Sequence, residues 1–297
     1  MLKKLFLILL GLNILSCKTS KNQSIIEENT NPILISDKFK FTEGPAADAK
    51  GNVYFTDQPN NRILKWSAET GEISIYMENA GRANGLYFDN EGRLIVAADE
   101  KSELWQINTE KKVKVLVDNY KNKRLNGPND LWVDANGGIY FTDPYYQRDY
   151  WKRQKPDIDK QRVYYLTPDK KEVKIVADDL VKPNGIIGSR ENAVLYIADI
   201  GAGMTYSYRL SKNGGLTDKN IFTEMGSDGM TMDEEGNVYL TGNGITVFNK
   251  KGEKLAHIPV DRNWTANATF GGENFDQLFI TASDAVYILQ MNVKGNN

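Results

Sequence analysis

Six side chains that carry oxygen recur at matching positions along the chain, and together they have the composition of a hard-cation site. Each lies 11 or 12 residues before the centre of an apolar run, and the six are Glu43, Asn84, Asn129, Asn184, Asp228 and Asn267. Two carboxylates and four amides that meet in one place need a cation or water to offset lone-pair repulsion and desolvation. Because the set contains no Cys or His, it favours Ca²⁺, with other divalent cations such as Mg²⁺, Mn²⁺ or Zn²⁺ as alternatives.

A turn requirement is the simpler explanation for any one of these positions. Four of the six are followed by glycine, which gives common turn pairs: Glu43-Gly44, Asn84-Gly85, Asn184-Gly185 and Asp228-Gly229. A turn would accept Ser or Gly equally well, however, and it does not explain Glu43. Six such positions in phase therefore favour a shared ligand set over six independent turns.

The apolar runs that follow these side chains define a repeat. Their centres are separated by 41, 45, 56, 43 and 40 residues, and they are Tyr54, Ile95, Tyr140, Tyr196, Tyr239 and Phe279. One unit per 40–45 residues is the period of a four-stranded propeller blade. The second unit displays all four strands, at 85–89, 93–99, 103–108 and 113–118. The sequence thus predicts an all-β fold, a six-bladed β-propeller with four antiparallel strands per blade.

Closure of the ring is also predicted. The sixth unit ends after its third apolar run, and residues 32–36, ahead of the first unit, supply a spare strand. We expect this N-terminal strand to complete the last blade, so that the propeller domain covers 32–293 and leaves a tail at 294–297. Each of the six oxygen-bearing side chains would directly precede the innermost strand of its blade, and pseudo-symmetry would bring them all to one end of the axis.

The N-terminus has the features of a bacterial lipoprotein signal. A basic start at 1–4 precedes an apolar stretch at 5–15 that is too short to span a bilayer, and Leu15-Ser16-Cys17 resembles a lipobox. We expect 1–17 to be a signal peptide with lipidation at Cys17, the only cysteine, followed by a polar tether at 18–31. This predicts an exported lipoprotein, facing the periplasm or on the cell surface and bound to membrane through its lipid alone. An uncleaved tail with an incidental cysteine is the alternative.

Composition excludes some partners. The 297 residues carry a net charge of −2, and a pI near 5.7 provides no basic field for nucleic acid. We expect a monomer that binds a small molecule. No Gly-rich phosphate loop, Cys/His zinc set or serine nucleophile elbow appears in the sequence.

Several motifs resemble the gluconolactonase/regucalcin family of six-bladed propellers, whose relatives include diisopropyl-fluorophosphatase. They are FTEGP (41–45), LNGPNDLWVD (125–134), YFTDP (140–144), KPNGI (182–186), SDGMTMDEEGNVY (227–239) and NATFGG (267–272). The resemblance implies a divalent metal, usually calcium, held by Glu43, Asn129, Asn184 and Asp228. It also implies that Asp228 is the catalytic base or nucleophile and that Asn129, Asn84 and Asn267 contact substrate.

The activity implied by the resemblance is metal-dependent hydrolysis of a lactone or related ester, with the ion polarising the carbonyl. A phosphotriesterase-like hydrolase on the same site and a non-catalytic ligand-binding propeller are alternatives, because fold alone does not decide function.

Four further features qualify this expectation. The segment Glu100-Lys101-Ser102-Glu103 departs from the family pattern, which puts one polar substrate contact in doubt. The long third unit has its excess at 145–161, either a lid or a surface excursion. The sole histidine, His257, is expected to be structural. Four aspartates that end the second strands, Asp57, Asp99, Asp143 and Asp199, are expected to cap strand ends rather than to surround a metal.

Overall fold

A computed structural model describes residues 24–27, 30–189, 191 and 193–296. The predicted signal peptide, Cys17 and the first part of the predicted tether lie outside these residues. In the part of the chain that is described, no helix is both long and apolar enough to cross a bilayer.

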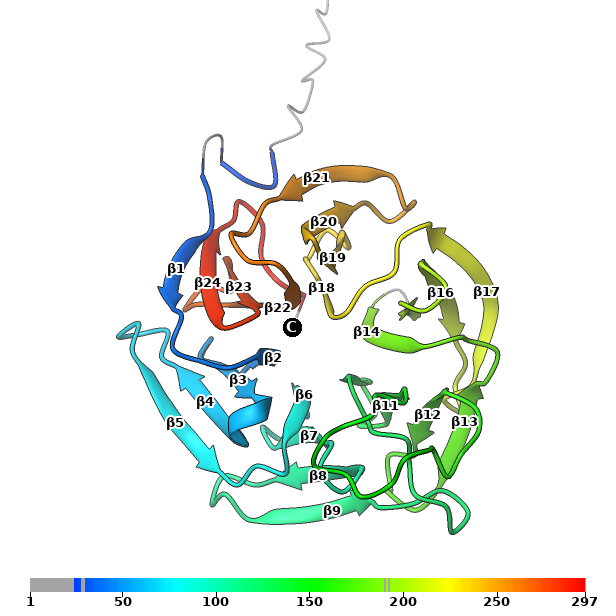
Figure 1. The fold of residues 1–297 in the computed structure, drawn as a ribbon. Helices are drawn as coiled ribbons and strands as arrows, with labels where there is room; N and C mark the ends of the chain where they lie inside the picture. The colour runs from blue at the N-terminus through cyan, green and yellow to red at the C-terminus, as the bar shows by residue number, and fades with distance from the viewer. Residues whose placement is uncertain (1–23, 28–29, 190, 192, 297) are drawn as a thin grey trace, which may run out of the picture.

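Six four-stranded antiparallel sheets surround a central axis, which confirms the predicted six-bladed β-propeller (Figure 1). The first blade contains β2 (Thr42–Ala47), β3 (Val53–Asp57), β4 (Arg62–Trp66) and β5 (Ile73–Glu78). The second contains β6 (Ala83–Phe88), β7 (Leu94–Ala98), β8 (Glu103–Ile107) and β9 (Val113–Val117). The third contains β10 (Leu131–Val133), β11 (Ile139–Asp143), β12 (Arg162–Leu166) and β13 (Val173–Ala177).

The remaining blades repeat this order from the axis outward. The fourth contains β14 (Pro183–Ser189), β15 (Val194–Asp199), β16 (Met204–Leu210) and β17 (Leu216–Thr223). The fifth contains β18 (Met230–Met232), β19 (Val238–Gly242), β20 (Gly244–Phe248) and β21 (Lys254–Ile258). The sixth contains β22 (Thr265–Gly271), β23 (Gln277–Ala282), β24 (Ala285–Gln290) and, from the other end of the chain, β1 (Ile33–Ser36). One short 3₁₀ turn, η1 (Gln58–Asn60), follows β3.

The ring closes as predicted, because β1 pairs antiparallel with β24. The docked region is longer than predicted at both ends. Ile26 bridges to Met291, and the neighbouring Ile25 is buried in the core of the last blade, so residues 24–27 are not free tether. The predicted tail also docks, since Gly295 bridges to Asp233. Burial of one apolar side chain at each end, Ile25 and Val293, favours this docking.

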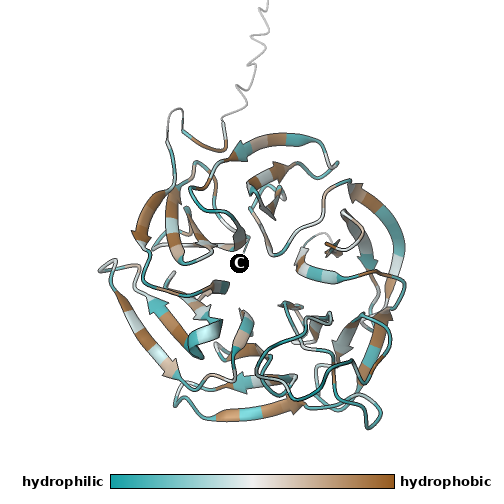
Figure 2. Cartoon of the chain, viewed as in Figure 1, coloured by the Kyte–Doolittle hydropathy of each residue, from teal (hydrophilic) through white to brown (hydrophobic). Residues whose placement is uncertain are grey.

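Burial follows the distance of a strand from the axis. The second strand of the second blade, LIVAA in β7, is buried throughout, whereas the outermost strand, β9, has exposed residues at its first three positions. Because one face of an outer strand contacts solvent and the other packs on the blade, these strands alternate between apolar and polar residues. Figure 2 shows the alternation as brown and teal bands. The core fills the spaces between blades. For example, the ring of Trp132 lies so close to Gly188 of the next blade that a Cβ there would be 2.5 Å from it.

Candidate functional site

A cavity of about 270 Å³ lies on the axis at the end where the innermost strands begin, and we call it the axial cavity. Four of the six predicted side chains line it: Glu43, Asn84, Asn129 and Asp228. The other lining residues are Phe41, Gln58, Tyr146, Arg148, Ile200 and Trp264. Positions separated by up to 185 residues in sequence are thus brought to one place, as the repeat predicted.

The backbone at these positions differs from the expectation. Only Asn129 and Asp228 directly precede an innermost strand; Glu43, Asn84 and Asn184 lie inside β2, β6 and β14. In these three strands the register shifts next to the polar residue, where two residues oppose one on the neighbouring strand. A bulge of this kind changes the direction in which a strand side chain points. Here each bulge lies beside a polar side chain that points toward the axis.

The glycines that follow these residues serve close packing between blades. A Cβ at Gly44 would lie 2.0 Å from the Asn84 carbonyl oxygen, and one at Gly85 would lie 2.5 Å from the Asn129 carbonyl oxygen. The backbone N–H of Gly85 donates to that same Asn129 oxygen at 2.7 Å. The glycines therefore let the inner strands approach one another, so the turn explanation does not account for them.

The two carboxylates of the axial cavity destabilise each other's charge. Burial raises the pKa of Glu43 well above its usual value, and the nearby charge of Asp228 raises it further. Burial also raises the pKa of Asp228, although hydrogen bonds from Trp264 and Asn184 and the charge of Arg148 oppose this effect. Two buried carboxylates in one cavity need either protons or a cation to be stable.

The amide of Asn184 bears on whether protons or a cation stabilise the two carboxylates. Its Nδ2 donates to Asp228 Oδ1 at 2.7 Å and to the Tyr146 hydroxyl at 3.0 Å. Its Oδ1 is buried and has no hydrogen-bond partner among the described residues. The opposite amide orientation would place this oxygen against a carboxylate oxygen. A buried acceptor without a donor among the described residues, beside the Asp228 carboxylate, fits a bound cation.

The available ligands are all oxygens. No three acidic, histidine or cysteine side chains gather into a metal cluster within the described residues. A cation in the axial cavity would therefore be held by two carboxylates and by amides, and this hard donor set suits Ca²⁺ better than Zn²⁺.

Asn267 is placed elsewhere. It lines a second cavity of about 330 Å³, formed by the other ends of the innermost strands and shared with Asp130, and its Oδ1 accepts a hydrogen bond from the Ala268 N–H at 2.8 Å. Burial raises the pKa of Asp130 to about 7. The structure thus brings five of the six predicted side chains to the axial cavity or its wall and separates Asn267 from them.

Residues 145–161, which we call the third-blade insertion, contribute the site residues that sequence reasoning missed. The insertion is the green loop that extends inward from the third blade in Figure 1. It supplies Tyr146 and Arg148 to the cavity lining. The 56-residue step marked the insertion in the sequence, but no pattern distinguished these two side chains from its other polar and aromatic residues. Gln58 and Trp264 were also missed, because each lies outside the repeated position.

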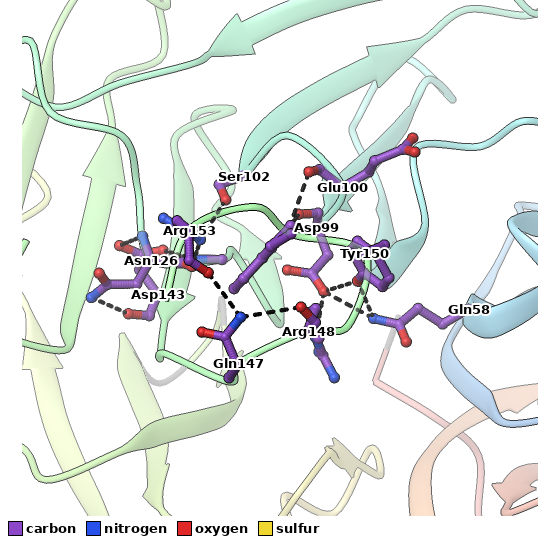
Figure 3. A network of polar contacts seen from close by, with 12 residues as sticks. Gln58, Asp99, Glu100, Ser102, Asn126, Asp143, Gln147, Arg148, Tyr150 and Arg153 are labelled. Carbon is purple, nitrogen blue, oxygen red and sulfur yellow. Dashed lines mark hydrogen bonds and ion pairs between the residues drawn. The ribbon is translucent and has the colours of Figure 1, made fainter. Parts of the chain in front are cut away.

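Asp99 anchors the third-blade insertion (Figure 3). Its Oδ2 accepts hydrogen bonds from Arg148 Nε at 2.7 Å, from the Tyr150 hydroxyl at 2.6 Å and from Gln58 Nε2 at 3.0 Å. Trp151 Nε1 donates to the Asp99 and Glu100 carbonyl oxygens, at 3.2 and 3.1 Å. The carboxylate of Asp99 thereby connects the second blade to the side chain that lines the cavity.

The other three strand-end aspartates act as predicted. Asp57, Asp143 and Asp199 each accept hydrogen bonds from two successive backbone N–H groups just before an innermost strand. In the second blade the matching Arg82 N–H donates instead to Asn61 Oδ1 at 2.6 Å. Asp99 is therefore available to hold the insertion, and its expected role as a strand cap is wrong.

The segment that departs from the family pattern contacts the same insertion. Ser102 Oγ accepts from Arg153 Nη2 at 2.9 Å, and the Glu100 carbonyl accepts from Trp151. These residues support the loop rather than line the cavity. His257 lies on β21, where its Nδ1 is 3.2 Å from Thr246 Oγ1, and it is not among the cavity residues.

Three comparisons with known proteins bear on the identity of this site. Residues 41–284 match the family model described as the SMP-30/Gluconolactonase/LRE-like region. The chain is similar to a gluconolactonase of Zymomonas mobilis, with 28% identity over 89% of this chain and 82% of that protein. It is also similar to lactonase drp35 of Staphylococcus aureus, with 27% identity over 75% of this chain and 71% of that protein.

A solved structure agrees with these sequence matches. The gluconolactonase of Xanthomonas campestris superposes with a TM-score of 0.83 at 28% identity, covering 90% of this chain and 91% of that one. The likeness therefore extends over the whole propeller, including every blade that contributes to the axial cavity.

Proposed function

This chain belongs to the SMP-30/gluconolactonase/LRE-like family, and on that premise we propose that it is a calcium-dependent lactonase whose reaction takes place in the axial cavity. Lactone hydrolysis is supported by the relatives named gluconolactonase and lactonase. The proposed ligands of the ion are Glu43, Asn129, Asn184 and Asp228.

One observation carries the calcium proposal. Asn184 Oδ1 is buried and has no hydrogen-bond donor in the described part of the chain, and it lies beside the carboxylate that its own Nδ2 contacts at 2.7 Å. An unpaired buried acceptor costs about 1–3 kcal/mol, a cost that a hard cation at this position would remove. When bound, calcium would act as a Lewis acid toward the lactone carbonyl and stabilise negative charge on its oxygen.

In the proposed mechanism Asp228 acts either as a general base or as a nucleophile. Trp264 Nε1 donates to Asp228 Oδ2 at 2.6 Å and Asn184 Nδ2 donates to Oδ1, so both oxygens have fixed directions. Asp228 either accepts a proton from the attacking water or attacks the carbonyl carbon itself. In both cases one water is consumed, the ring C–O bond breaks, and the product is a hydroxy acid.

The other residues of the cavity position the lactone. The amides of Asn84 and Asn129 line the cavity and can hydrogen-bond to ring or hydroxyl oxygens of the substrate. Tyr146 and Arg148 line it from the third-blade insertion, which limits access of water from that side. Substrate orientation by such groups lowers the entropic part of the barrier.

A substrate screen tests the proposed function. Aldonolactones and phosphotriesters should be offered in chelator and then in excess Ca²⁺, with hydrolysis followed by proton release. We expect lactone hydrolysis that chelator abolishes and Ca²⁺ restores. Turnover of phosphotriesters alone would replace the proposal with a phosphotriesterase. If Ca²⁺ raised the melting temperature without any hydrolysis, the protein would be a binding propeller.

The metal site makes a separate prediction for Glu43→Gln, read from stability. Without calcium at pH 8, the variant should be more stable than the wild type, because it removes one of two buried, mutually repelling charges. The pKa of Glu43 is raised in the folded state, so the folded state binds more protons and wild-type stability falls as pH rises above the unfolded pKa. The difference in stability between Glu43→Gln and the wild type should therefore be smaller at pH 5 than at pH 8.

Excess Ca²⁺ at pH 8 should make the wild type more stable than Glu43→Gln, because only the wild type keeps both carboxylate ligands. Thermal melting with and without chelator measures these differences, at roughly 2–4 °C for each kcal/mol. An unchanged order on addition of Ca²⁺ would exclude Glu43 as a ligand.

A further inference from the structure

Arg148 reaches the axial cavity with only part of its guanidinium in use. Its Nε is paired with Asp99 Oδ2 at 2.7 Å, and neither terminal nitrogen has a hydrogen-bond partner among the described residues. The Arg148 side chain is 24% exposed, whereas that of Asp99 is 2% exposed. In Figure 3 the Asp99 side chain lies between Arg148, Tyr150 and Gln58, and its contact with Nε fixes one edge of the Arg148 guanidinium.

The position of Arg148 is fixed before any ligand binds. Asp99 also accepts from Tyr150 and Gln58, and Trp151 packs the same loop onto the second blade. A planar fork that is already oriented loses little conformational freedom on binding, and its two terminal N–H groups match the two oxygens of a carboxylate.

Two more cations lie beside the same insertion. Lys182 Nζ is 4.5 Å from the centre of the Tyr146 ring, and Arg82 Cζ is 4.3 Å from the centre of the Tyr150 ring. Neither cation forms an ion pair within the described part of the chain. The third-blade insertion thus has two further cations in contact with its aromatic rings.

The charges inside the cavity are balanced when a divalent cation is present. Such an ion offsets Glu43 and Asp228, and Asp99 offsets Arg148. Lys182 and Arg82 lie outside the cavity lining, next to aromatic rings of the third-blade insertion. A pre-oriented guanidinium inside the cavity attracts an anion more strongly than a neutral sugar.

We propose that Arg148 determines substrate specificity and that the preferred substrate is a lactone bearing a carboxylate, which Arg148 binds through its two terminal nitrogens. The proposal rests on the lactonase function proposed above and specifies its substrate class. The carboxylate would contact Arg148 while the lactone carbonyl lies near Asp228. Both groups line the same cavity, and Arg148 is close enough to lower the pKa of Asp228 by its charge.

A matched pair of substrates tests this inference. D-glucaro-1,4-lactone carries a free carboxylate where D-glucono-1,4-lactone carries a neutral CH₂OH. The wild type in Ca²⁺ should hydrolyse the anionic lactone with a kcat/KM roughly 10–100-fold higher, the range that one charge-assisted contact provides. Arg148→Gln should remove this preference by lowering kcat/KM for the anionic lactone, mainly through a higher KM, and should lower kcat/KM for the neutral lactone far less.

Circular dichroism and thermal melting show whether Arg148→Gln is folded. Arg148→Lys should recover part of the preference, because it restores the charge without the two-nitrogen fork. Arg209→Gln is the matched control, since Arg209 is an exposed arginine paired with Asp218 on the outer part of the fourth blade. It should leave both substrates unaffected.

Two results would overturn the inference: a wild type that prefers the neutral lactone, or an Arg148→Gln variant that slows both lactones equally. If neither lactone is hydrolysed, the proposed function fails instead. Calorimetric binding of the two intact lactones then tests the inference alone, which predicts tighter binding of D-glucaro-1,4-lactone to the wild type and equal binding of both lactones to Arg148→Gln.

Discussion

Replacement of Asp228 by asparagine should lower kcat/KM for lactone hydrolysis by about 10²–10⁴-fold while the propeller stays folded. The variant keeps the shape of the side chain but loses the charge and the proton-accepting or attacking oxygen. It also disturbs Asn184, whose Nδ2 now donates to Asp228 Oδ1 at 2.7 Å. With Trp264 donating to one atom of the new amide, the other atom would be an NH₂ group facing the Asn184 NH₂ group.

Relief of that contact would turn the Asn184 amide around and direct its oxygen away from the proposed ion. We therefore expect weaker Ca²⁺ binding in Asp228→Asn as well, and activity must be compared at Ca²⁺ concentrations that saturate each protein. Calorimetry gives the affinity and initial rates give the activity. A variant that binds Ca²⁺ and hydrolyses lactones at the wild-type rate would eliminate the carboxylate from the mechanism.

Asp233→Asn is the matched control for this experiment. Asp233 is also a buried aspartate of the fifth blade whose pKa burial raises, but its partners are Asn237 and Tyr239 rather than cavity residues. Its replacement should lower stability and leave kcat/KM at saturating Ca²⁺ within about 3-fold of the wild type. A similar loss of activity in both variants would point to a general loss of structure.

The fold could be predicted because each blade repeats the same local requirement. A strand that is buried on both faces reads as an apolar run, and six such runs at nearly constant spacing permit only a closed ring of similar sheets. The missing strand of the last unit and the spare run at 32–36 predicted the closure by β1 for the same reason. The docking of residues 24–27 could not be read in this way, because Ile25 and Ile26 are two apolar residues in a polar stretch.

The sequence predicted the site less completely, and Asn267 shows why. In β6 and β14 the extra residue of the bulge coincides with the polar residue and its glycine, at 84–85 and 184–185. In β22 the irregularity falls before Asn267, between Thr265 and Asn267, whereas in β2 it falls after Glu43. A shift of one residue reverses the face to which a strand side chain points. The counted spacing does not reveal this shift.

Arg148 and Tyr146 were missed for a different reason. Sequence length identifies an insertion, but tertiary contacts decide which of its side chains enter the cavity. Those contacts include Asp99, whose type and spacing match three aspartates that bind backbone N–H groups. In the second blade Asn61, rather than Asp99, accepts the hydrogen bond from the Arg82 N–H, so Asp99 can bind the insertion. The repeat pattern does not predict that Asn61 takes this role.

Asp99→Ala should have the largest effect on stability of any single change discussed, lowering the free energy of unfolding by roughly 3 kcal/mol. The carboxylate is 2% exposed and accepts from Arg148, Tyr150 and Gln58, so its removal leaves a partly buried cation and two donors without their acceptor. Arg148 is 24% exposed and can turn toward water, which keeps the loss at the low end for a broken buried pair. Urea unfolding monitored by circular dichroism measures this loss.

The chain contains its own control in the exposed pair of Arg209 and Asp218, whose side chains are 68% and 65% exposed. Asp218→Ala should cost less than about 1 kcal/mol, because water screens the pair. Asp99→Ala should also speed hydrogen exchange at residues 145–153, since the insertion loses its anchor, whereas Asp218→Ala should not. The prediction would be contradicted if both variants lost the same free energy of unfolding and hydrogen exchange in the insertion stayed unchanged. Asp99 would then not hold the loop over the cavity, and the loop alone would position Arg148.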